Sequence, residues 1–401
     1  MRLCFLSQED VVKPQGGTGT YVRNMSLALA ARGHDVQVIT RQYHGARSFE
    51  QVGGVSVHRV PAPGPPVLYS PLYFRQTHRK FEVLSRLAPF EALHGNMPLM
   101  SSWGVRAGPL PPVIETVHCT VREELRALAS TSLRALNFNE LLVRLIAPTW
   151  LRRERYLLRR ARCVIAVSAG LKRELVEQNG YPDEKIVVIP NGIDYDRFAK
   201  RTSPEQSMAI RRSLGIAEDE RVILYLGRLM ERKRVIDLVR ALPHIQTRIP
   251  NVSLVVVGKR NHNAVLLEQT ARQLGVAARV TLVDHVPYQD VPGYYALADV
   301  YALPSAYEGF PFTILEAMAS RTPVAASRIP GIDEQIVSDE TGLLHPVGDI
   351  DTLAQNLIRI LANQALAARL TSAAQKVVEQ NYNWDVIGAR TEQVFEGVVA
   401  G

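Results

Sequence analysis

The chain has 401 residues, of which 46% are hydrophobic and 21% are charged, with 26 Gly, 24 Pro and 3 Cys. This length and composition indicate two globular domains and exclude a disordered, collagenous or disulfide-stapled protein. The three cysteines are far apart and form no CxxC pair, which argues against a disulfide framework or a zinc site.

The formal net charge of +8 is distributed unevenly along the chain. Residues 1–197 contain 26 Lys and Arg against 17 Asp and Glu, an excess of +9, whereas residues 198–401 contain 21 against 22. Residues 121–162 alone contain 10 basic and 4 acidic side chains, interleaved with apolar ones. This pattern is typical of an interfacial helix on anionic lipid, but a solvated surface helix interrupted by Pro148 would show it too. No nucleic-acid partner is expected, because no helix-turn-helix, RNP or zinc signature accompanies the charge.

Short apolar runs separated by helical patterns recur through the first half of the chain. Strands are predicted to begin at Leu3, Asp35, Val55, Val113, Cys163 and Ile186. Helices are predicted over residues 21–32 and 169–179. The runs are too continuously apolar for a sheet with one wet face, so they predict a parallel sheet covered by helices on both faces.

The same alternation begins again after the polar stretch 200–220. The strand-like runs of this second half are RVILYLG, VSLVVVG, RVTLVD, DVYALPS and PVAAS. The sequence therefore predicts an α/β protein with two doubly wound domains, over residues 1–197 and 198–383. We expect these domains to face each other across a cleft at the carboxyl ends of their strands.

Three segments could bind an anionic ligand, and the first is the glycine-rich loop at residues 16–19. Because glycine lets backbone N–H groups approach an anion at a helix N-terminus, Gly16 and Gly17 are candidate phosphate contacts. The loop is neither GxGxxG nor a Walker A motif, so a simple tight turn explains it equally well.

The second segment follows the first strand of the second half. Arg228 and Lys233 would emerge at the carboxyl end of this strand, where a guanidinium can bind a diphosphate bidentately and an ammonium adds a point charge. An ordinary surface pair is the alternative, since Arg232 and Arg234 show that basic residues are frequent here.

The third segment is PSAYEGFPFTILEAMA, over residues 304–319. A strand is predicted to end at Pro304 and a helix to begin near Thr313, so backbone donors of residues 309–314 would point at an anion. Glu308 in the loop and Glu316 one turn into the helix could accept hydrogen bonds from sugar hydroxyls at two places along a ligand. Alternatively, the two glutamates have only structural roles, in a turn and at a helix N-terminus.

The run EGFPFTILE closely resembles the E-x7-E motif of retaining glycosyltransferases of family 4, which have the GT-B fold of two facing Rossmann-like domains. The resemblance covers nearly the whole chain. It also includes GGTGTYVRNMSLALAARGHDV, VIETVH with His118, VSAGLKREL, IPNGID and GRL with Lys233. It implies that a final helix over residues 384–401 packs back on the N-terminal domain.

The resemblance also implies a role for each candidate residue. Arg228 and Lys233 would hold the donor diphosphate and stabilise the leaving nucleotide, and Glu316 would bind the ribose. Glu308 and His118 would lie at the donor sugar, although His118 taken alone would be a packed residue at a strand end. The remaining expected donor contacts are Gly16, Gly17, Gly258, Phe310, Pro311, Phe312, Thr313, Ile314 and Leu315.

The implied reaction moves a hexosyl or N-acetylhexosaminyl unit from a UDP- or GDP-linked sugar to a hydroxyl acceptor with retained configuration. It would proceed by front-face attack in which the departing phosphate helps to deprotonate the acceptor. Glycolipid, polysaccharide or other glycoconjugate biosynthesis would use this reaction. Two alternatives stay open: a GT-B sugar-nucleotide 2-epimerase, and a non-catalytic membrane-surface protein of polysaccharide assembly.

We expect neither a metal ion nor a cofactor. Residues 194–196 and 349–351 spell DxD, but they lie in a linker and beside a helix start, where aspartate caps well. Arg234 and His285 stand where the family commonly has glycine, and His285 leaves the identity of the base open. Cys119 beside His118 is a poor thiol nucleophile, because neighbours on a strand point to opposite faces.

The charge of the first half suggests an anionic acceptor, such as a lipid-linked or phosphorylated sugar, or an anionic membrane around it. No apolar run approaches the roughly 18 residues that span a bilayer, and the N-terminus lacks the pattern of a signal peptide. We expect a cytoplasmic protein, which is peripheral on the inner face of the plasma membrane if residues 121–162 bind lipid.

Overall fold

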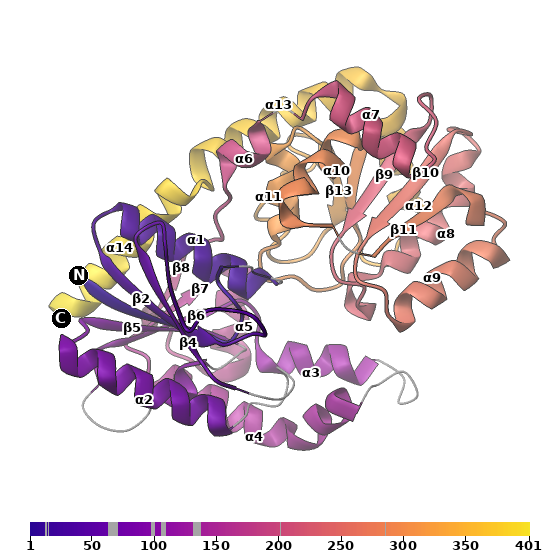
Figure 1. Ribbon diagram of the computed structural model, residues 1–401. Coiled ribbons are helices and arrows are strands. Elements are labelled where there is room, and N and C mark those ends of the chain that lie inside the picture. The colour runs from indigo at the N-terminus through magenta and orange to yellow at the C-terminus, as the bar shows by residue number, and fades with distance from the viewer. Residues whose placement is uncertain are drawn as a thin grey trace. The chain divides into compact units, whose positions relative to one another are not determined.

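The computed structural model describes residues 1–12, 14, 16–62, 71–97, 101–105, 110–130, 138–200, 202–284 and 286–401. The chain divides into two compact units, one formed by Met1–Gly192 with Trp384–Gly401 and the other by Ile193–Asn383 (Figure 1). Each unit is built on a β-sheet with helices on both faces, as the alternating pattern predicts. His285 and residues 63–66 of the proline-rich segment PAPGPP, which spans residues 61–66, lie outside the described residues.

The first unit contains an eight-stranded sheet with the order β3-β4-β2-β1-β5-β6-β7-β8. Its strands are β1 (Arg2–Ser7), β2 (Asp35–Arg41), β3 (Phe49–Val52), β4 (Val55–Val60), β5 (Ala92–Met97), β6 (Val113–Val117), β7 (Cys163–Ala166) and β8 (Ile186–Val188). All pairs are parallel except β3 with β4. The antiparallel β3 is exposed at the edge of the sheet, and the apolar pattern did not predict it because its sequence, FEQV, is half polar.

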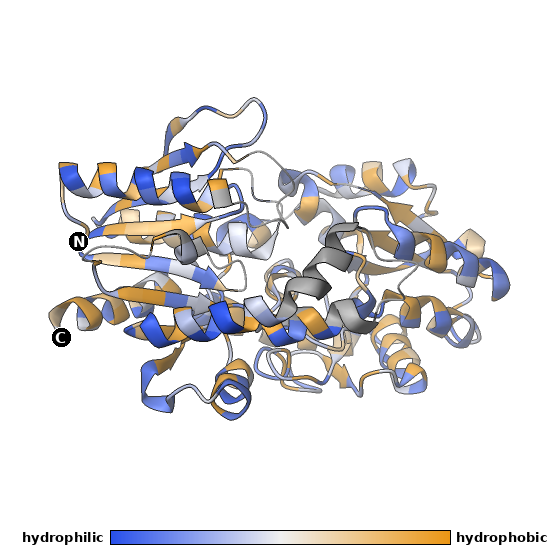
Figure 2. Cartoon of the chain, turned by 90° about the horizontal axis from the view of Figure 1, so that it is seen from below, coloured by the Kyte–Doolittle hydropathy of each residue, from blue (hydrophilic) through white to orange (hydrophobic). Residues whose placement is uncertain are grey.

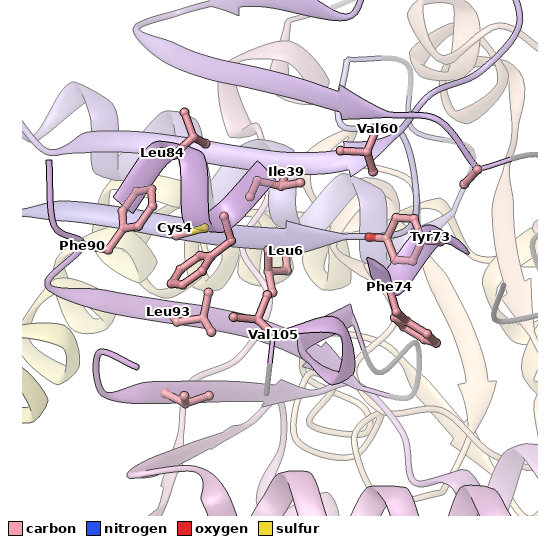
Figure 3. Close-up of a cluster of buried hydrophobic side chains, with 13 residues drawn as sticks. Cys4, Leu6, Ile39, Val60, Tyr73, Phe74, Leu84, Phe90, Leu93 and Val105 are labelled. Atoms are coloured by element: carbon pink, nitrogen blue, oxygen red, sulfur yellow. The ribbon is translucent and has the colours of Figure 1, made fainter. Parts of the chain in front are cut away.

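The two faces of this sheet are covered by different helices. The helices of the unit are α1 (Gly17–Ala31), α2 (Pro71–Leu87), η1 (Ser101–Gly104), α3 (Val121–Ser130), α4 (Phe138–Arg160), α5 (Ala169–Asn179), η2 (Asp183–Lys185) and α14 (Trp384–Ala400). On one face Phe5 stacks on Phe395 of α14, which also packs against α1. The next residue along β1, Leu6, points to the other face and joins a core cluster with Tyr73 and Phe81 of α2 (Figure 3).

The second unit contains a six-stranded, fully parallel sheet with the order β11-β10-β9-β12-β13-β14. Its strands are β9 (Arg221–Leu226), β10 (Val252–Val257), β11 (Val280–Val283), β12 (Val300–Leu303), β13 (Val324–Ser327) and β14 (Leu343–His345). Its helices are α6 (Tyr195–Ala199), α7 (Pro204–Ser213), η3 (Glu231–Lys233), α8 (Val235–Gln246), α9 (His262–Gln273), η4 (Ala277–Arg279), η5 (Tyr288–Asp290), α10 (Val291–Leu297), α11 (Phe312–Ala319), α12 (Ile350–Ala362) and α13 (Gln364–Asn381). Figure 2 shows that the strands are predominantly hydrophobic while the covering helices alternate, which is the pattern of a sheet buried on both faces.

Two helices differ from the pattern that the sequence suggests. Helix α1 begins at Gly17, about one turn before Tyr21, so the glycines form the helix start and not a preceding loop. Helix α4 continues through Pro148, which the sequence suggested as an interruption. Within the described ranges, no helix is both long and apolar enough to cross a membrane.

Candidate functional site

The carboxyl ends of β9, β10 and β12 lie beside one another, because these strands are neighbours in the second sheet. Gly227, Gly258 and Pro304 follow these strands directly. The N–H of Gly258 donates to the carbonyl of Val283 at 2.9 Å, and a Cβ atom at residue 258 would collide with the carbonyl of Gly227. Only glycine fits this close approach of two backbones, so Gly258 shapes the edge by packing.

Two buried tyrosines hold the turn after β9. The hydroxyl of Tyr225 donates to the carbonyl of Arg228 at 2.9 Å, and that of Tyr301 donates to the carbonyl of Leu226 at 3.4 Å. Burial raises the pKa of Tyr225 above its usual value, so its hydroxyl keeps the proton that it donates. The backbone that carries Arg228 is therefore fixed from inside the sheet.

The structure brings Lys233 and Glu308 into contact. The Nζ atom of Lys233 donates to Oε1 of Glu308 at 2.5 Å, and the Ser305 hydroxyl donates to the same oxygen at 2.7 Å. The two charged side chains are only 15% and 9% exposed. The N–H of Ala306 also donates to the carbonyl of Arg232 at 2.7 Å, which ties the loop after β12 to η3.

The charges around Glu308 keep its carboxyl group ionised. Burial alone would raise the pKa of Glu308, but the ammonium of Lys233, the hydrogen bonds from Lys233 and Ser305 and the charge of Arg232 hold it below its usual range. Burial lowers the pKa of Lys233, and Glu308 opposes that shift. The carboxylate of Glu308 can therefore accept hydrogen bonds from a ligand at neutral pH.

Glu316 lies in the second turn of α11 and is nearly buried, with 6% exposed. The hydroxyl of Tyr295 donates to its Oε2 at 2.8 Å, while Oε1 accepts no hydrogen bond from any other described residue. Burial raises the pKa of Glu316 to about 7, against the opposing effects of the Tyr295 bond and the Arg197 charge. The site thus contains two carboxyl groups of unequal acidity at opposite ends of the segment 308–316.

The loop before α11 is packed so that mainly its backbone is available to a ligand. The ring of Phe310 is buried and lies 5.5 Å from that of Tyr382, and Nε2 of Gln335 donates to the carbonyl of Pro311 at 3.1 Å. Helix α11 begins at Phe312, one residue before the predicted Thr313. Ile314 and Leu315 are fully buried, which limits them, like Phe310, to backbone contacts with a ligand.

The remaining candidates, His118, Gly16 and Gly17, lie in the first unit. His118 follows β6, its Nε2 is 3.2 Å from Oδ1 of Asn96, and its ring meets the edge of Tyr21 at 4.7 Å. Burial lowers the pKa of His118 to about 3, so the imidazole is neutral. These contacts agree with a packed residue at a strand end, and the expected contact with a donor sugar remains a prediction.

A carboxylate that the sequence did not reveal lies at the glycine-rich start of α1. Oε2 of Glu9 accepts a hydrogen bond from the N–H of Gly19 at 2.6 Å. A Cβ atom at Gly16 would lie 2.6 Å from Oε1 of Glu9. The N-terminus of α1 thus already binds a carboxylate of its own chain. The presence of an acidic residue between the first strand and the glycines could have predicted this contact.

The two DxD sequences have capping roles in the structure. Oδ1 of Asp194 accepts from the N–H of Arg197 at 3.3 Å at the start of α6, and Oδ1 of Asp349 accepts from Thr352 at 2.9 Å at the start of α12. Across the described part of the chain, no group of three or more His, Cys, Asp or Glu residues could hold a metal ion. Cys119 is buried.

Arg234, at the position where the family commonly has glycine, adopts the left-handed conformation with φ of 50°. Its Nε donates to Oδ2 of the buried Asp237 at 2.7 Å, and this ion pair offsets the cost of the conformation. Arg234 therefore makes the same turn that glycine would make at this position.

Two family descriptions match successive parts of the chain. Residues 15–197 match "Glycosyltransferase Family 4" and residues 206–377 match "Glycosyl transferases group 1". The chain is 29% identical over 400 residues to a protein of Methanocaldococcus jannaschii described as an uncharacterized glycosyltransferase, covering 99% of this chain and 98% of that one.

Two further relatives have more specific names. A GDP-mannose-dependent alpha-(1-6)-phosphatidylinositol monomannoside mannosyltransferase of Mycolicibacterium smegmatis is 28% identical, with 98% of both chains covered. The solved structure of sucrose-phosphate synthase from Thermosynechococcus elongatus matches with a TM-score of 0.81 and 25% identity, covering 100% of this chain and 99% of that one. Together with the two parallel-sheet units, these matches confirm the predicted fold class: the chain is a family 4 glycosyltransferase with the GT-B fold.

Proposed function

We propose that the chain transfers a hexosyl or N-acetylhexosaminyl unit from a UDP- or GDP-linked sugar to a hydroxyl acceptor, with retained anomeric configuration. The observation that carries the proposal is the buried contact of Lys233 with Glu308 beside the turn that bears Arg228. It combines cations suited to a diphosphate with an ionised carboxylate suited to sugar hydroxyls.

The cations would bind the leaving group. Arg228 and Lys233 would hold the two phosphates and stabilise the charge that develops on the nucleotide as the glycosidic bond breaks. They would supply the positive charge that a metal ion supplies in other transferases, so we propose that the reaction is independent of metal.

The two carboxyl groups would hold the neutral parts of the donor. Glu308, whose pKa lies below its usual range, would accept hydrogen bonds from the sugar, and Oε1 of Glu316 would accept from the ribose. Backbone N–H groups at the start of α11 would contact phosphate. The acceptor hydroxyl would attack from the same face as the departing phosphate, which takes its proton.

The experiment that tests this function is nucleotide release from a panel of UDP-, GDP- and ADP-sugars without acceptor and with EDTA present. We expect slow hydrolysis of one donor that is lost in Arg228→Ala and unchanged in Arg272→Ala, an exposed arginine of α9. Hydrolysis that requires added metal would contradict the metal-independent proposal. No release from any donor, or release of UDP with an epimerised sugar, would contradict the transferase reaction.

We further propose that the acceptor is anionic and lies in or on a lipid surface. The name of the mannosyltransferase relative gives GDP-mannose as its donor and a phosphatidylinositol monomannoside as its acceptor. In this chain, the exposed side of α4 presents Arg152, Arg155 and Arg159 together with Tyr156. All three arginines are exposed, so their charge is available to a lipid headgroup.

Helix α2, which contacts η1 as α4 does, also has an exposed side with basic and apolar residues. Its exposed residues include Leu72, Val83 and Leu87, with 38%, 52% and 77% exposed, interspersed with arginines. Helices α2 and α4 both contact η1 on the same face of the first sheet (Figure 1). Basic and apolar residues exposed on two helices would bind an anionic bilayer better than the charged residues of one helix alone.

Vesicle flotation tests this second proposal. We expect the chain to float with vesicles of anionic phospholipid and not with neutral ones, and to lose flotation when Arg152, Arg155 and Arg159 are all changed to Glu. The matched control changes three exposed arginines of the second unit, Arg212, Arg248 and Arg272, to Glu. Equal absence of binding to both vesicles, or equal loss in the control, would contradict a lipid-binding surface on α4.

A further inference from the structure

The short helix α6 contains an arginine that the donor-site motifs do not include. Phe198 of this helix is 2% exposed, and its ring lies 6.1 Å from the rings of both Tyr288 and Tyr295. Helix α6 also packs against α11, the helix that carries Glu316. Phe198 thus fixes α6 within the second unit. The preceding residue, Arg197, lies where α6, η5 and α11 meet.

Arg197 holds the first residue of η5 by two kinds of contact. Its Cζ lies 4.2 Å from the centroid of the Tyr288 ring, and its Nη2 donates to the carbonyl of Tyr288 at 3.1 Å. Stacking and a hydrogen bond to one residue define the orientation of a planar guanidinium. Tyr288 lies in the segment 286–290, which follows β11, and the family resemblance implies that the nucleotide base would lie beside this turn.

The same arginine acts on Glu316. Its Nε is buried and has no hydrogen-bond partner in the described part of the chain, and its charge opposes the effect of burial on the pKa of Glu316. Among the described residues, Tyr295 of α10 and Tyr301 of β12 are the ionisable groups that interact electrostatically with Glu316 besides Arg197. Helix α13 packs against the end of α11 through Gln375, whose Nε2 donates to the carbonyl of Ala319 at 3.4 Å, and its Glu379 interacts with Tyr195 of α6.

We infer that Arg197 is a positioning residue for the nucleoside end of the donor: it fixes the turn at Tyr288 from a helix that packs against α11, the helix of Glu316. This inference rests on the proposed function, because it assigns Arg197 to the ribose and base contacts of that same site. It explains why a charged residue is half-buried between two segments that would contact the base and the ribose.

The test compares donor kinetics and nucleotide binding for the wild type, Arg197→Gln and Arg197→Lys over pH 6 to 9. Arg197→Gln removes the charge, so it should raise the donor KM about tenfold at pH 7 with kcat within about twofold, because the contacts concern ground-state binding. It should also move the pH at which nucleotide affinity is half lost upward by about one unit, because more Glu316 is protonated. Arg197→Lys should restore the pH dependence but not the full affinity, since lysine cannot stack as guanidinium does.

Two outcomes separate this inference from the proposed function. If the wild type binds no nucleotide and hydrolyses no donor, the proposed function fails. If the wild type is active and Arg197→Gln retains its KM and its pH dependence, the inference about Arg197 fails alone. Arg272→Ala is the control for loss of an exposed arginine, and melting curves of all variants identify any that do not fold.

Discussion

The Nζ atom of Lys233 lies 2.5 Å from Oε1 of Glu308, so a cation suited to phosphate and a carboxylate suited to sugar hydroxyls are held in one buried ion pair. Each charge stabilises the ionised form of the other against the effect of burial. The pair joins η3 to the loop before α11, and its two residues are 75 positions apart in the sequence. Removing either side chain should therefore change the pKa of the other.

Lys233→Ala should reduce donor turnover by at least about 100-fold and change its pH dependence, because a charge that stabilises the transition state is lost. Without the ammonium, the pKa of Glu308 rises, so its carboxyl group is protonated at a higher pH than in the wild type. The residual rate should then fall as the pH is lowered through a range in which the wild-type Glu308 stays ionised. Measurement of kcat/KM over this range checks the prediction, and a parallel decrease at every pH would contradict the coupling.

Gly258→Ala should destabilise the protein by about 1–3 kcal/mol, because the added Cβ would collide with the carbonyl of Gly227 and force the two strand ends apart. Donor turnover should decrease with it, since the displaced turn carries Arg228. Urea denaturation measures the free energy of unfolding. Gly397→Ala is the control: nothing lies within 4 Å of a Cβ at that helical position, so alanine there should stabilise slightly. Equal effects of both substitutions would contradict the packing argument.

Gly16→Ala should weaken the start of α1, because its Cβ would lie within 3 Å of both carboxylate oxygens of Glu9. Because the clash is with the Glu9 side chain, shortening that acid in the double variant Glu9→Ala with Gly16→Ala should recover part of the loss. A thermodynamic cycle of the two variants measures this coupling, which we expect to exceed about 0.5 kcal/mol. Additive effects would show instead that Gly16 acts independently of Glu9.

The pH dependence of stability should reflect a buried acid in the first unit. Burial raises the pKa of Glu115 to about 7, against the hydrogen bond from Ser102 and the charge of Arg160. Because this value lies above the usual one, the folded state binds more protons than the unfolded state between about pH 4.5 and pH 7. Glu115 therefore stabilises at low pH, and its contribution decreases as the pH rises, by at most about 1.4 kcal/mol per unit.

Glu115→Gln should remove this part of the pH dependence. The difference in unfolding free energy between pH 5 and pH 8, obtained from urea titrations, should be smaller in the variant than in the wild type. Ser102→Ala is the control, because it removes the hydrogen bond but keeps the ionisable group. An unchanged difference in Glu115→Gln would contradict the raised pKa of Glu115.

The features that the sequence predicted correctly are those that depend on local patterns of residues. Continuous apolar runs identified β10 and its neighbours, and the E-x7-E spacing placed Glu308 before α11 and Glu316 within it. What it could not predict depends on contacts between distant segments. The bond from Tyr295 to Glu316 spans 21 residues, and the stacking of Arg197 on Tyr288 spans 91.

Other misses have local causes. Strand β3 is short and half polar, so it lacks the apolar signal of a buried strand. Helix α1 begins at Gly17 because the Glu9 carboxylate accepts from the N–H of Gly19, and glycine propensity alone gives no reason for a helix to start there.

Arg228 and Lys233 should together bind the diphosphate of a nucleotide, and calorimetry of nucleotide binding can measure this. The base is first identified from the panel of donors, and the affinity of its nucleoside diphosphate is then compared with that of its monophosphate. We predict that the diphosphate binds the wild type at least about tenfold more tightly, and that this difference disappears in Arg228→Ala and Lys233→Ala but not in Arg272→Ala. A difference that persists in both site variants would contradict the account.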